Sequence, residues 1–390
     1  MHDLLSDDQR MIKDLVRKFV ESELIPLEKT VQEREAGRGL GNDPVIPPEA
    51  QARLMERASE LGLWGMDVPE EFGGSGLGMA VKMVAVEEMN RSITPFRLPP
   101  ESPNLFLLSK TCTPSQREKY LLPYAAGKKR SSLALTEAGA GSDVSAIRTV
   151  AKKVDGGWVI NGSKMWISWA DLADFFIVVA LTDKEKGTRG GMTSFLIDKD
   201  TPGFTIGNFV PTMGEPTPYE LLLENVFIPD DQVLGEVGYA FKPLTNRLGV
   251  RRIEIAARCV GMASRLIDLM SLQASNRVTF GQPLGERQGV QWMIADSVIE
   301  VHAARLMVRD AALKLDMGIA DVREEASATK VFATEMITRV VDRAMQVHGG
   351  LGFSKETPIE YIYRNSRVLR ILEGASEIHR MQIARQHIGK

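Results

Sequence analysis

The middle of the chain constrains the fold most, because its residue pattern differs from the pattern on both sides. From residue 130 to residue 239, segments rich in β-branched and aromatic residues, such as DFFIVVAL and YELLLENVFI, alternate with Asp-Gly, Gly-Gly and Asn-Gly pairs. This alternation is typical of β-strands joined by tight turns. We therefore predict a middle β domain over residues 130–239.

The sequence on either side of this stretch repeats its apolar residues with the period of a helix. Ser6 begins a capping box ahead of an amphipathic segment, and a long apolar series in the last third ends at Gly349-Gly350. Strands are not interleaved with helices, so a doubly wound dinucleotide-binding fold is disfavoured. We predict an α+β chain with an N-terminal helical domain over residues 1–129 and a C-terminal helical domain over residues 240–390.

A single carboxylate near the C-terminus, Glu373, stands between two helical segments and is followed by a glycine. A capping box at Thr357 predicts a helix that reaches about Ile371, and Ser376 is expected to cap the next helix. Gly374 allows other atoms to approach the backbone closely. We therefore expect a corner between two helices, where Glu373 either faces solvent or serves a bound molecule.

Composition and charge exclude several classes of function. The 48 basic and 51 acidic residues give a net charge of −3, so no nucleic-acid partner is expected. Cys112 and Cys259 form neither a disulfide framework nor a zinc motif, and the five histidines lack metal-ligand spacing. No apolar run approaches the length of a membrane span. We expect no metal, no membrane contact and a reducing compartment: the cytoplasm, or the mitochondrial matrix for a mature eukaryotic form.

Two motifs in the predicted β domain offer residues that suit a flat, polar-edged ring. The segment TEAGAGSD places Thr136 and Ser142 around glycines, but Val144 stands where a Rossmann motif needs a third glycine. In KMWIS, Trp166 and Ser168 are two residues apart on a predicted strand, hence on one face. The indole can pack on a flavin and the hydroxyl can bond to it. The ordinary alternative is a core tryptophan beside a satisfied serine.

Two further motifs lie in the predicted C-terminal helices. In RVTFG, Arg277 offers a guanidinium suited to a pyrophosphate, with Phe280 beside it. In QVHGG, Gln346 lies at a helix end where backbone groups can meet another molecule. Each motif alone is also compatible with an ordinary surface position.

Taken together and in order, the motifs resemble those of the flavin-dependent acyl-CoA dehydrogenase family. TEAGAGSD, KMWIS, RVTFG, QVHGGLG and LEGASEIHR follow one another, and the resemblance extends from about Ser6 to about Ile388. It implies the fold of that family, in which the C-terminal domain resembles a four-helix bundle. It also implies that FAD oxidises an acyl-CoA thioester to the trans-2-enoyl-CoA and that an electron-transfer flavoprotein receives the electrons.

The resemblance assigns the catalytic role to Glu373, which matches the family's base for the α-proton. Its backbone N–H and a flavin ribityl hydroxyl would bond to the thioester carbonyl. The substrate contacts implied are Ser142, Arg252 near the CoA arm, and Gly374. The FAD contacts implied are Leu135, Thr136, Ser142, Trp166, Ser168, Arg277, Phe280, Gln288, Gln346, Gly349, Gly350 and Glu377. Of these, the segment from Gln346 to Gly350 would reach the FAD of a neighbouring subunit, which implies a homodimer or homotetramer.

Some positions depart from the family pattern or leave alternatives open. Ala375 replaces a frequent threonine, a loss that Glu377 could partly offset. Some branches carry the base at the position of Arg251, so no carboxylate competes with Glu373 there, and Glu254 is interpreted as structural. Arg97 is a candidate partner for the distal carboxylate of a dicarboxylic acyl group, the alternative being an ion pair with Glu101. Acyl-CoA oxidase, flavin monooxygenase and a non-catalytic scaffold remain alternatives, although Glu373 disfavours the monooxygenase.

Overall fold

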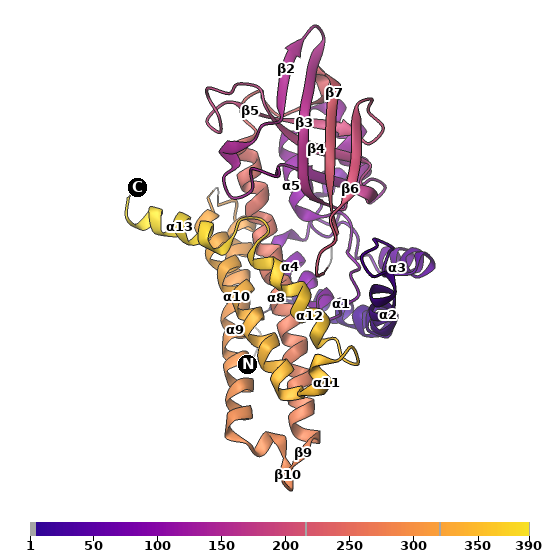
Figure 1. Cartoon of the computed structure of the whole chain (residues 1–390), viewed down its shortest axis with the longest axis vertical. Helices are drawn as coiled ribbons and strands as arrows, with labels where there is room; N and C mark the ends of the chain where they lie inside the picture. Colours follow the sequence, from indigo (N-terminus) through magenta and orange to yellow (C-terminus); the bar gives the residue numbers. More distant parts are fainter. Residues whose placement is uncertain (1–4, 215–216, 320, 390) are drawn as a thin grey trace.

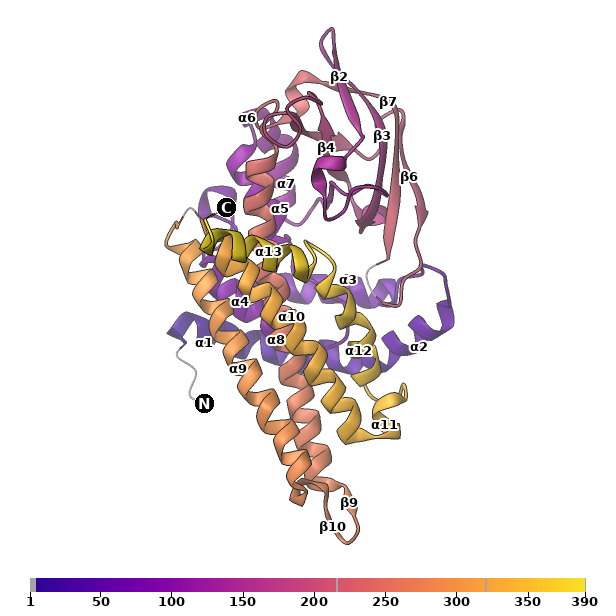
Figure 2. The same ribbon diagram turned by 60° about the vertical axis from the view of Figure 1, so that its left-hand side comes forward.

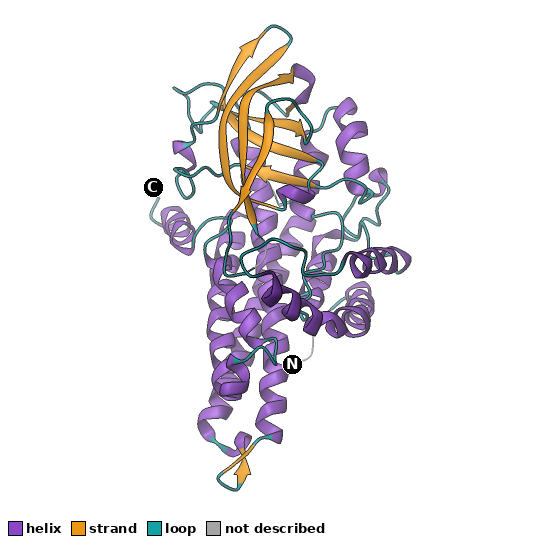
Figure 3. Ribbon diagram, turned by 45° about the vertical axis from the view of Figure 1, so that its right-hand side comes forward, coloured by secondary structure: helices purple, strands orange, loops and turns teal. Residues whose placement is uncertain are grey.

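The structure, a computed structural model, describes residues 5–214, 217–319 and 321–389. Helices come first in the chain, a sheet follows and helices complete it, which confirms the predicted α+β class (Figures 1 and 3). The sheet forms the upper part of the molecule in Figure 1, and the long C-terminal helices extend away from it.

The N-terminal helices pack against the base of the sheet and against the C-terminal helices. They are α1 (Asp7–Phe19), α2 (Glu28–Arg38), α3 (Pro48–Glu60), α4 (Gly78–Met89), α5 (Ser102–Thr111), α6 (Pro114–Gln116) and α7 (Leu122–Ala125). The capping box predicted at Ser6 is present, and its side chain accepts a hydrogen bond from the backbone N–H of Gln9. Helix α4 is buried on nearly all sides, as its predominantly apolar sequence requires.

The strands form one mostly antiparallel sheet in the order β6-β7-β3-β2-β4-β5-β8, with β1 pairing parallel to β4. The strands are β1 (Ser131–Ala134), β2 (Val150–Val154), β3 (Gly157–Ser168), β4 (Phe175–Leu181), β5 (Met192–Asp198), β6 (Phe204–Phe209), β7 (Pro218–Pro229) and β8 (Val233–Leu234). Strand β4 is buried along its whole length, which explains its unbroken apolar run.

Three long helices dominate the C-terminal part: α8 (Phe241–Asn276), α9 (Gln288–Asp316) and α10 (Arg323–His348). A short hairpin of β9 (Val278–Thr279) and β10 (Gln282–Pro283) joins α8 to α9 at the end farthest from the sheet (Figure 1). The chain closes with α11 (Gly350–Phe353), α12 (Ile359–Arg367) and α13 (Ser376–His387), and α13 packs across α10 (Figure 2).

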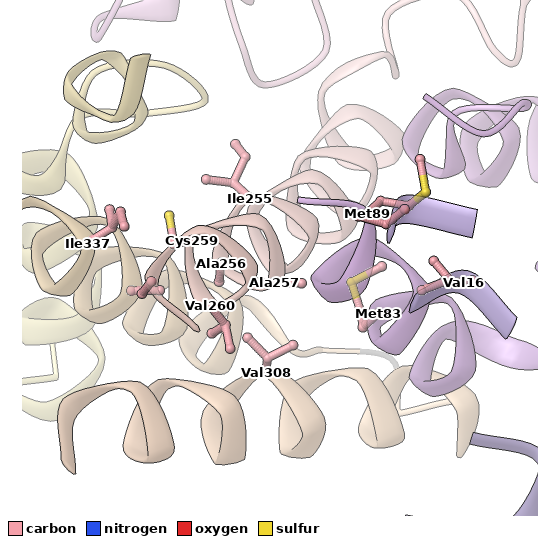
Figure 4. Close-up of a cluster of buried hydrophobic side chains, with 14 of the residues drawn as sticks. Val16, Met83, Met89, Ile255, Ala256, Ala257, Cys259, Val260, Val308 and Ile337 are labelled. Carbon is pink, nitrogen blue, oxygen red and sulfur yellow. The ribbon is translucent and has the colours of Figure 1, made fainter. Parts of the chain in front are cut away.

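The N-terminal and C-terminal helices share one hydrophobic core. Val16 and Met83 meet apolar residues of α8 and α9 there, among them Val260 and Val308 (Figure 4). Helices α4 and α8 approach closely at Gly261, where an added Cβ would lie 2.0 Å from the carbonyl oxygen of Glu87. This contact fixes α8 against α4 and so fixes the side chains that α8 presents on its other faces.

Two predictions about helix ends near the C-terminus are wrong in detail. Helix α12 ends at Arg367 and a single 3₁₀ turn follows it, so the helix does not reach Ile371. Ala375, not Ser376, occupies the N-cap position of α13, and no side chain caps that helix. Because Glu373 and Gly374 have left-handed backbone, α13 begins at Ser376, one residue earlier than expected for a helix with Ser376 as its N-cap.

Candidate active site

A cavity of about 2130 Å³ lies where the sheet meets the helices, and all three parts of the chain line it. Its volume exceeds the ~300–1,000 Å³ of a typical small-molecule site, so it has room for two ligands side by side. Among the predicted site residues, those on its wall are Arg97, Leu135, Thr136, Ser142, Trp166, Ser168, Arg252, Glu373 and Gly374.

Glu373 and Gly374 form the predicted corner, and both have left-handed backbone, with φ of 56° and 97°. This conformation costs a non-glycine residue on the order of 1–3 kcal/mol, so surrounding contacts must hold it. The Nε of Arg252 donates to the carbonyl oxygen of Glu373 at 3.2 Å, and the Nζ of Lys330 donates to that of Gly374 at 2.7 Å. Two cationic side chains from α8 and α10 therefore hold the corner in place.

The carboxylate of Glu373 reaches the cavity wall beside two arginines. Arg247 Nη1 lies 3.4 and 3.3 Å from its two oxygens, and Arg251 Nε lies 3.9 Å from the nearer one. These contacts are longer than the ~2.7–2.9 Å of a tight charge-assisted bond. Arg247 is itself positioned by a 3.0 Å hydrogen bond from its Nε to Asn104. The carboxylate is thus oriented into the cavity by weak contacts that a bound molecule can replace.

Two buried titratable groups lie behind the corner. Lys330 is fully buried, and burial lowers its pKa to about 8. His379 is also fully buried, and burial, together with the charges of Arg252 and Lys330, lowers its pKa to about 3. An added Cβ on Gly374 would lie 2.9 Å from His379 Nε2, so glycine is the residue that this packing admits.

The glycine-rich loop is anchored by a buried ion pair. Lys164 of β3, fully buried, donates to Glu137 at 2.8 Å and to the carbonyl oxygen of Leu135 at 3.0 Å. Burial lowers the pKa of Lys164 to about 8, although the hydrogen bond to Glu137 opposes that shift. An added Cβ on Gly139 or Gly141 would meet no atom within 4 Å. The loop is therefore held rigidly from behind while its glycine backbone stays open to a ligand.

Trp166 points into the cavity because β3 is irregular at this position. The pairing register with β7 shifts between Lys164 and Ile167, and Trp166 has a φ of 64°. Such a bulge redirects a side chain and concentrates strain at functional sites. The indole is 51% exposed, and Ser168 shares the cavity wall with it. An exposed indole, a nearby hydroxyl and open glycine backbone fit the flat ring system of a flavin.

Helix α8 presents a stripe of charged residues to the cavity that the residue pattern could have revealed. Arg247, Arg251, Glu254 and Arg258 recur at spacings of four, three and four, which places them on one helical face. Both oxygens of Glu254 accept hydrogen bonds of 3.0 Å from Arg251. Glu254 is therefore ion-paired, in agreement with its structural interpretation, yet it lies on the cavity wall.

Arg97 and Arg252 have partners within the chain that differ from their proposed substrate contacts. The guanidinium of Arg97 is ion-paired with Glu101 and lies 4.8 Å above the ring of Trp169. Burial alone would raise the pKa of Glu101, but the charges of Arg97 and Arg251 lower it to about 2. Arg97 thus adopts the alternative considered for it, and its role toward a distal carboxylate stays a prediction, as does the role of Arg252 toward CoA.

Seven predicted FAD contacts are absent from the cavity wall of this chain. They are Arg277, Phe280, Gln288, Gln346, Gly349, Gly350 and Glu377. Arg277 directly precedes the β9–β10 hairpin at the far end of the molecule, and Phe280 lies in the turn of that hairpin (Figure 1). The side chain of Phe280 is 97% exposed. Glu377 is exposed in the first turn of α13. One chain therefore does not bring these residues to the cavity that holds Trp166.

Neither metal clusters nor membrane helices occur in the described ranges. Residues 5–214, 217–319 and 321–389 contain no group of three or more His, Cys, Asp or Glu side chains placed to hold a metal ion. Within the same ranges, each helix is too short or too polar to cross a bilayer.

Comparison with known proteins places the whole chain in one family. Residues 6–128, 132–226 and 241–388 match the N-terminal, middle and C-terminal domains of acyl-CoA dehydrogenases. The (R)-benzylsuccinyl-CoA dehydrogenase of Thauera aromatica is 50% identical over 388 residues, 98% of this chain and 96% of the relative. Butyryl-CoA dehydrogenase from Megasphaera elsdenii superimposes with a TM-score of 0.90 at 32% identity and full coverage of both chains. A chain from a study of the electron transferring flavoprotein of Acidaminococcus fermentans superimposes with a TM-score of 0.87 at 30% identity, also with full coverage of both chains.

Proposed function

Because the chain belongs to the acyl-CoA dehydrogenase family, we propose that it oxidises an acyl-CoA thioester to the trans-2-enoyl-CoA with Glu373 as the base. The observation that carries this proposal is the corner at Glu373, whose carboxylate faces a cavity large enough for a cofactor and a substrate. Members of this family are FAD-dependent flavoproteins, and we assign FAD to the wall formed by Trp166 and Ser168.

Glu373 would act through two of its groups. Its carboxylate takes the proton from the α-carbon, while the β-hydrogen leaves with its electron pair and a carbon–carbon double bond forms. Its backbone N–H has no hydrogen-bond partner within the described part of the chain, so it is free to donate to the thioester carbonyl. One such donor stabilises the developing enolate by about 3 kcal/mol. Arg252 and Lys330 keep both groups in place by holding the adjacent carbonyls.

The FAD site would use the open side of the glycine-rich loop and the strained end of β3. When bound there, FAD supplies the acceptor for the hydride. Trp166 would pack against the ring, and the hydroxyls of Thr136, Ser142 and Ser168 would offer hydrogen bonds to its polar edge. The buried ion pair of Lys164 and Glu137 supports this wall, with Lys164 behind it and Glu137 on the cavity lining.

A second copy of the chain would complete the FAD site. Arg277 and Phe280 lie far from the cavity of their own chain, yet the family resemblance assigns them to the cofactor. A fully exposed aromatic ring with a φ of 50° at a hairpin tip is suited to insertion into a neighbouring molecule. We therefore assign these residues, with Gln346, Gly349 and Gly350, to the FAD of a partner subunit in a homodimer or homotetramer.

We assign the electrons to an electron-transfer flavoprotein, an assignment supported by the match to the Acidaminococcus study. The experiment that tests the proposal is anaerobic titration of the yellow protein with a panel of acyl-CoA thioesters. Bleaching of the flavin and formation of the enoyl-CoA are expected. Slow reoxidation by air, together with fast reoxidation by an electron-transfer flavoprotein, would support the dehydrogenase, whereas fast reoxidation by air would identify an oxidase. A protein that purifies without FAD and cannot bind it would contradict the proposal.

A further inference from the structure

The charged stripe on α8 contains one arginine that lacks a carboxylate partner. Arg247 lies beside Glu373, Arg251 is paired with Glu254, and Arg97 on the opposite loop is paired with Glu101. Arg258 instead donates from its Nε to the amide oxygen of Asn90 at 3.3 Å. Within the described residues, no carboxylate lies within ion-pair distance of Arg258.

This arginine is poorly compensated by its surroundings. Arg258 is only partly exposed and lines the cavity. Burial and the like charges of Arg97 and Arg251 lower its pKa to about 10, and the more distant charge of Glu254, which is paired with Arg251, opposes this shift only in part. A partly buried cation without a counterion costs several kcal/mol unless an anion or strong hydrogen bonds compensate it. A neutral amide at 3.3 Å compensates only a small part of that cost.

The charges on this part of the cavity wall also show that one carboxylate too few is present to neutralise the arginines. Four arginines, at positions 97, 247, 251 and 258, face three carboxylates, at positions 101, 254 and 373, which leaves one positive charge in excess. Arg252 adds a second, but its Nε is occupied by the carbonyl oxygen of Glu373. One bound anion at Arg258 would remove one of these two excess positive charges.

The position of Arg258 along α8 says where that anion lies relative to the chemistry. Arg258 is seven residues beyond Arg251, which corresponds to two helical turns or ~10 Å. Arg251 Nε is 3.9 Å from the carboxylate of Glu373. Met89 and Met262 line the cavity near this end and provide adaptable apolar surface for a carbon chain.

We propose that Arg258 and Asn90 form an anion-binding subsite at the far end of the acyl chamber, and that this subsite takes a second carboxylate carried by the acyl group. The proposal rests on the acyl-CoA dehydrogenase function proposed above and specifies the class of substrate, the CoA thioester of a dicarboxylic acid. Arg258, rather than the already paired Arg97, is the specificity-determining residue. A guanidinium held by an amide oxygen is pre-oriented for a bidentate bond to a carboxylate.

Pairs of acyl-CoA thioesters that differ only in the free carboxylate test this subsite. Adipyl-CoA is compared with hexanoyl-CoA, which carries a methyl group in place of the free carboxylate. The rate of anaerobic flavin bleaching gives kcat/KM for each substrate. We expect the wild type to prefer adipyl-CoA over hexanoyl-CoA. In Arg258→Met the preference should fall by about 10- to 100-fold, the effect of losing a charged hydrogen bond, mostly through KM.

Two further variants make the result decisive. Arg258→Lys keeps the charge but loses the fork geometry, so it should retain part of the preference, and it covers the case in which the Met variant does not fold. Arg91→Met is the matched control, because Arg91 lies next to Asn90 in sequence but is paired with Glu88 and Asp268 and is absent from the cavity wall. The Arg91→Met variant should prefer adipyl-CoA over hexanoyl-CoA as strongly as the wild type does.

Failure of this inference is distinguishable from failure of the proposed function. If hexanoyl-CoA bleaches the flavin as well as adipyl-CoA does in the wild type, the subsite is refuted while the dehydrogenase stands. An unchanged preference in a folded Arg258→Met variant also refutes it. If no acyl-CoA thioester bleaches the flavin, the proposed function itself is wrong.

Discussion

Lys330 donates a 2.7 Å hydrogen bond to the carbonyl oxygen of Gly374, the residue that directly follows Glu373 in the strained corner. The bond joins a fully buried side chain of α10 to the backbone that positions the proposed base. Lys330 does not line the cavity, so it acts on the site through that backbone and through its charge, which also interacts with Glu373.

Replacing Lys330 with methionine should impair chemistry more than stability. The variant loses the bond that orients Glu373, and misplacement by about 1 Å can cost on the order of 100-fold in rate. It also removes a buried ammonium group whose desolvation opposes folding. We expect flavin bleaching to slow by about 10- to 100-fold while the unfolding midpoint changes little. Lys314→Met, which removes a surface ion pair with Glu325, is the control. An equal loss of rate and stability would indicate a merely structural role.

Replacing Glu373 with glutamine should abolish substrate oxidation without releasing FAD. An amide cannot take the α-proton, and general-base catalysis contributes about 10²- to 10⁴-fold. Bound FAD is measured by absorbance, and the rate of bleaching is measured by stopped flow under anaerobic conditions. Glu254→Gln is the matched control, because Glu254 lines the same cavity but is paired with Arg251. Near-normal turnover in the Glu373 variant, with loss in the Glu254 variant, would transfer the base to Glu254.

Replacing Lys164 with methionine should destabilise the wall of the proposed FAD site. Glu137 would keep its bonds from the backbone N–H groups of Arg148 and Thr149 but lose its buried cation. Removing one partner of a buried ion pair lowers the unfolding free energy by about 3–5 kcal/mol, because the other charge stays buried without compensation. Urea denaturation and FAD retention report the two effects. The double variant Lys164→Met with Glu137→Gln should recover part of the loss, and no recovery would show that the charge pair is not the cause.

His379 should make stability depend on pH in the acid range. Its pKa is lowered to about 3 in the folded chain, against an ordinary value of 6.5. Between these two values the unfolded chain binds a proton that the folded chain excludes, so stability falls as pH drops from about 6.5 toward 3. The slope from one such group is at most about 1.4 kcal/mol per pH unit. His379→Gln should show a shallower fall of the unfolding free energy over this range, and equal slopes would refute the assignment.

Replacing Arg277 with alanine should weaken FAD retention and subunit association together. Arg277 follows the last residue of α8, where it contributes little to the helical core, so the fold should be unaffected. Loss of a charge-assisted contact to pyrophosphate should increase the FAD dissociation constant by about 10-fold or more. Gel filtration and a filtration assay for FAD measure the two properties. A stable monomer that still holds FAD would show that the partner role proposed for this hairpin is wrong.

Features that depend on neighbouring residues could be predicted from the sequence. The capping box at Ser6 is present, because it is closed within three residues. The capping box predicted at Thr357 is wrong, because Pro358, whose side chain makes no capping hydrogen bond, is the N-cap residue of α12. The helical stop at Gly349 is also correct. The strained backbone at Trp166 was not predicted, because a register shift against β7 produces it and no local pattern marks that shift.

Contacts between distant segments account for most of what the sequence did not reveal. Lys330 and Gly374 are 44 residues apart, and only the packing of α10 under the corner brings them together. Arg258 was visible as one member of a regular stripe, but its lack of a carboxylate partner depends on where Asn90 and the other arginines lie. The sequence therefore points to the proposed base, Glu373, more readily than to the residues that hold it.

Helix α8 runs without interruption from Arg252, which bonds to the backbone of the proposed base Glu373, to Arg258 at the proposed anion-binding subsite. A substitution at Arg258 leaves the register of Arg252 unchanged, whereas one residue inserted between them would rotate Arg258 by about 100° around the helix axis relative to Arg252. A point substitution at Arg258 can therefore change the recognised acyl group, whereas an insertion or deletion in this segment would disturb the hold of α8 on the corner as well.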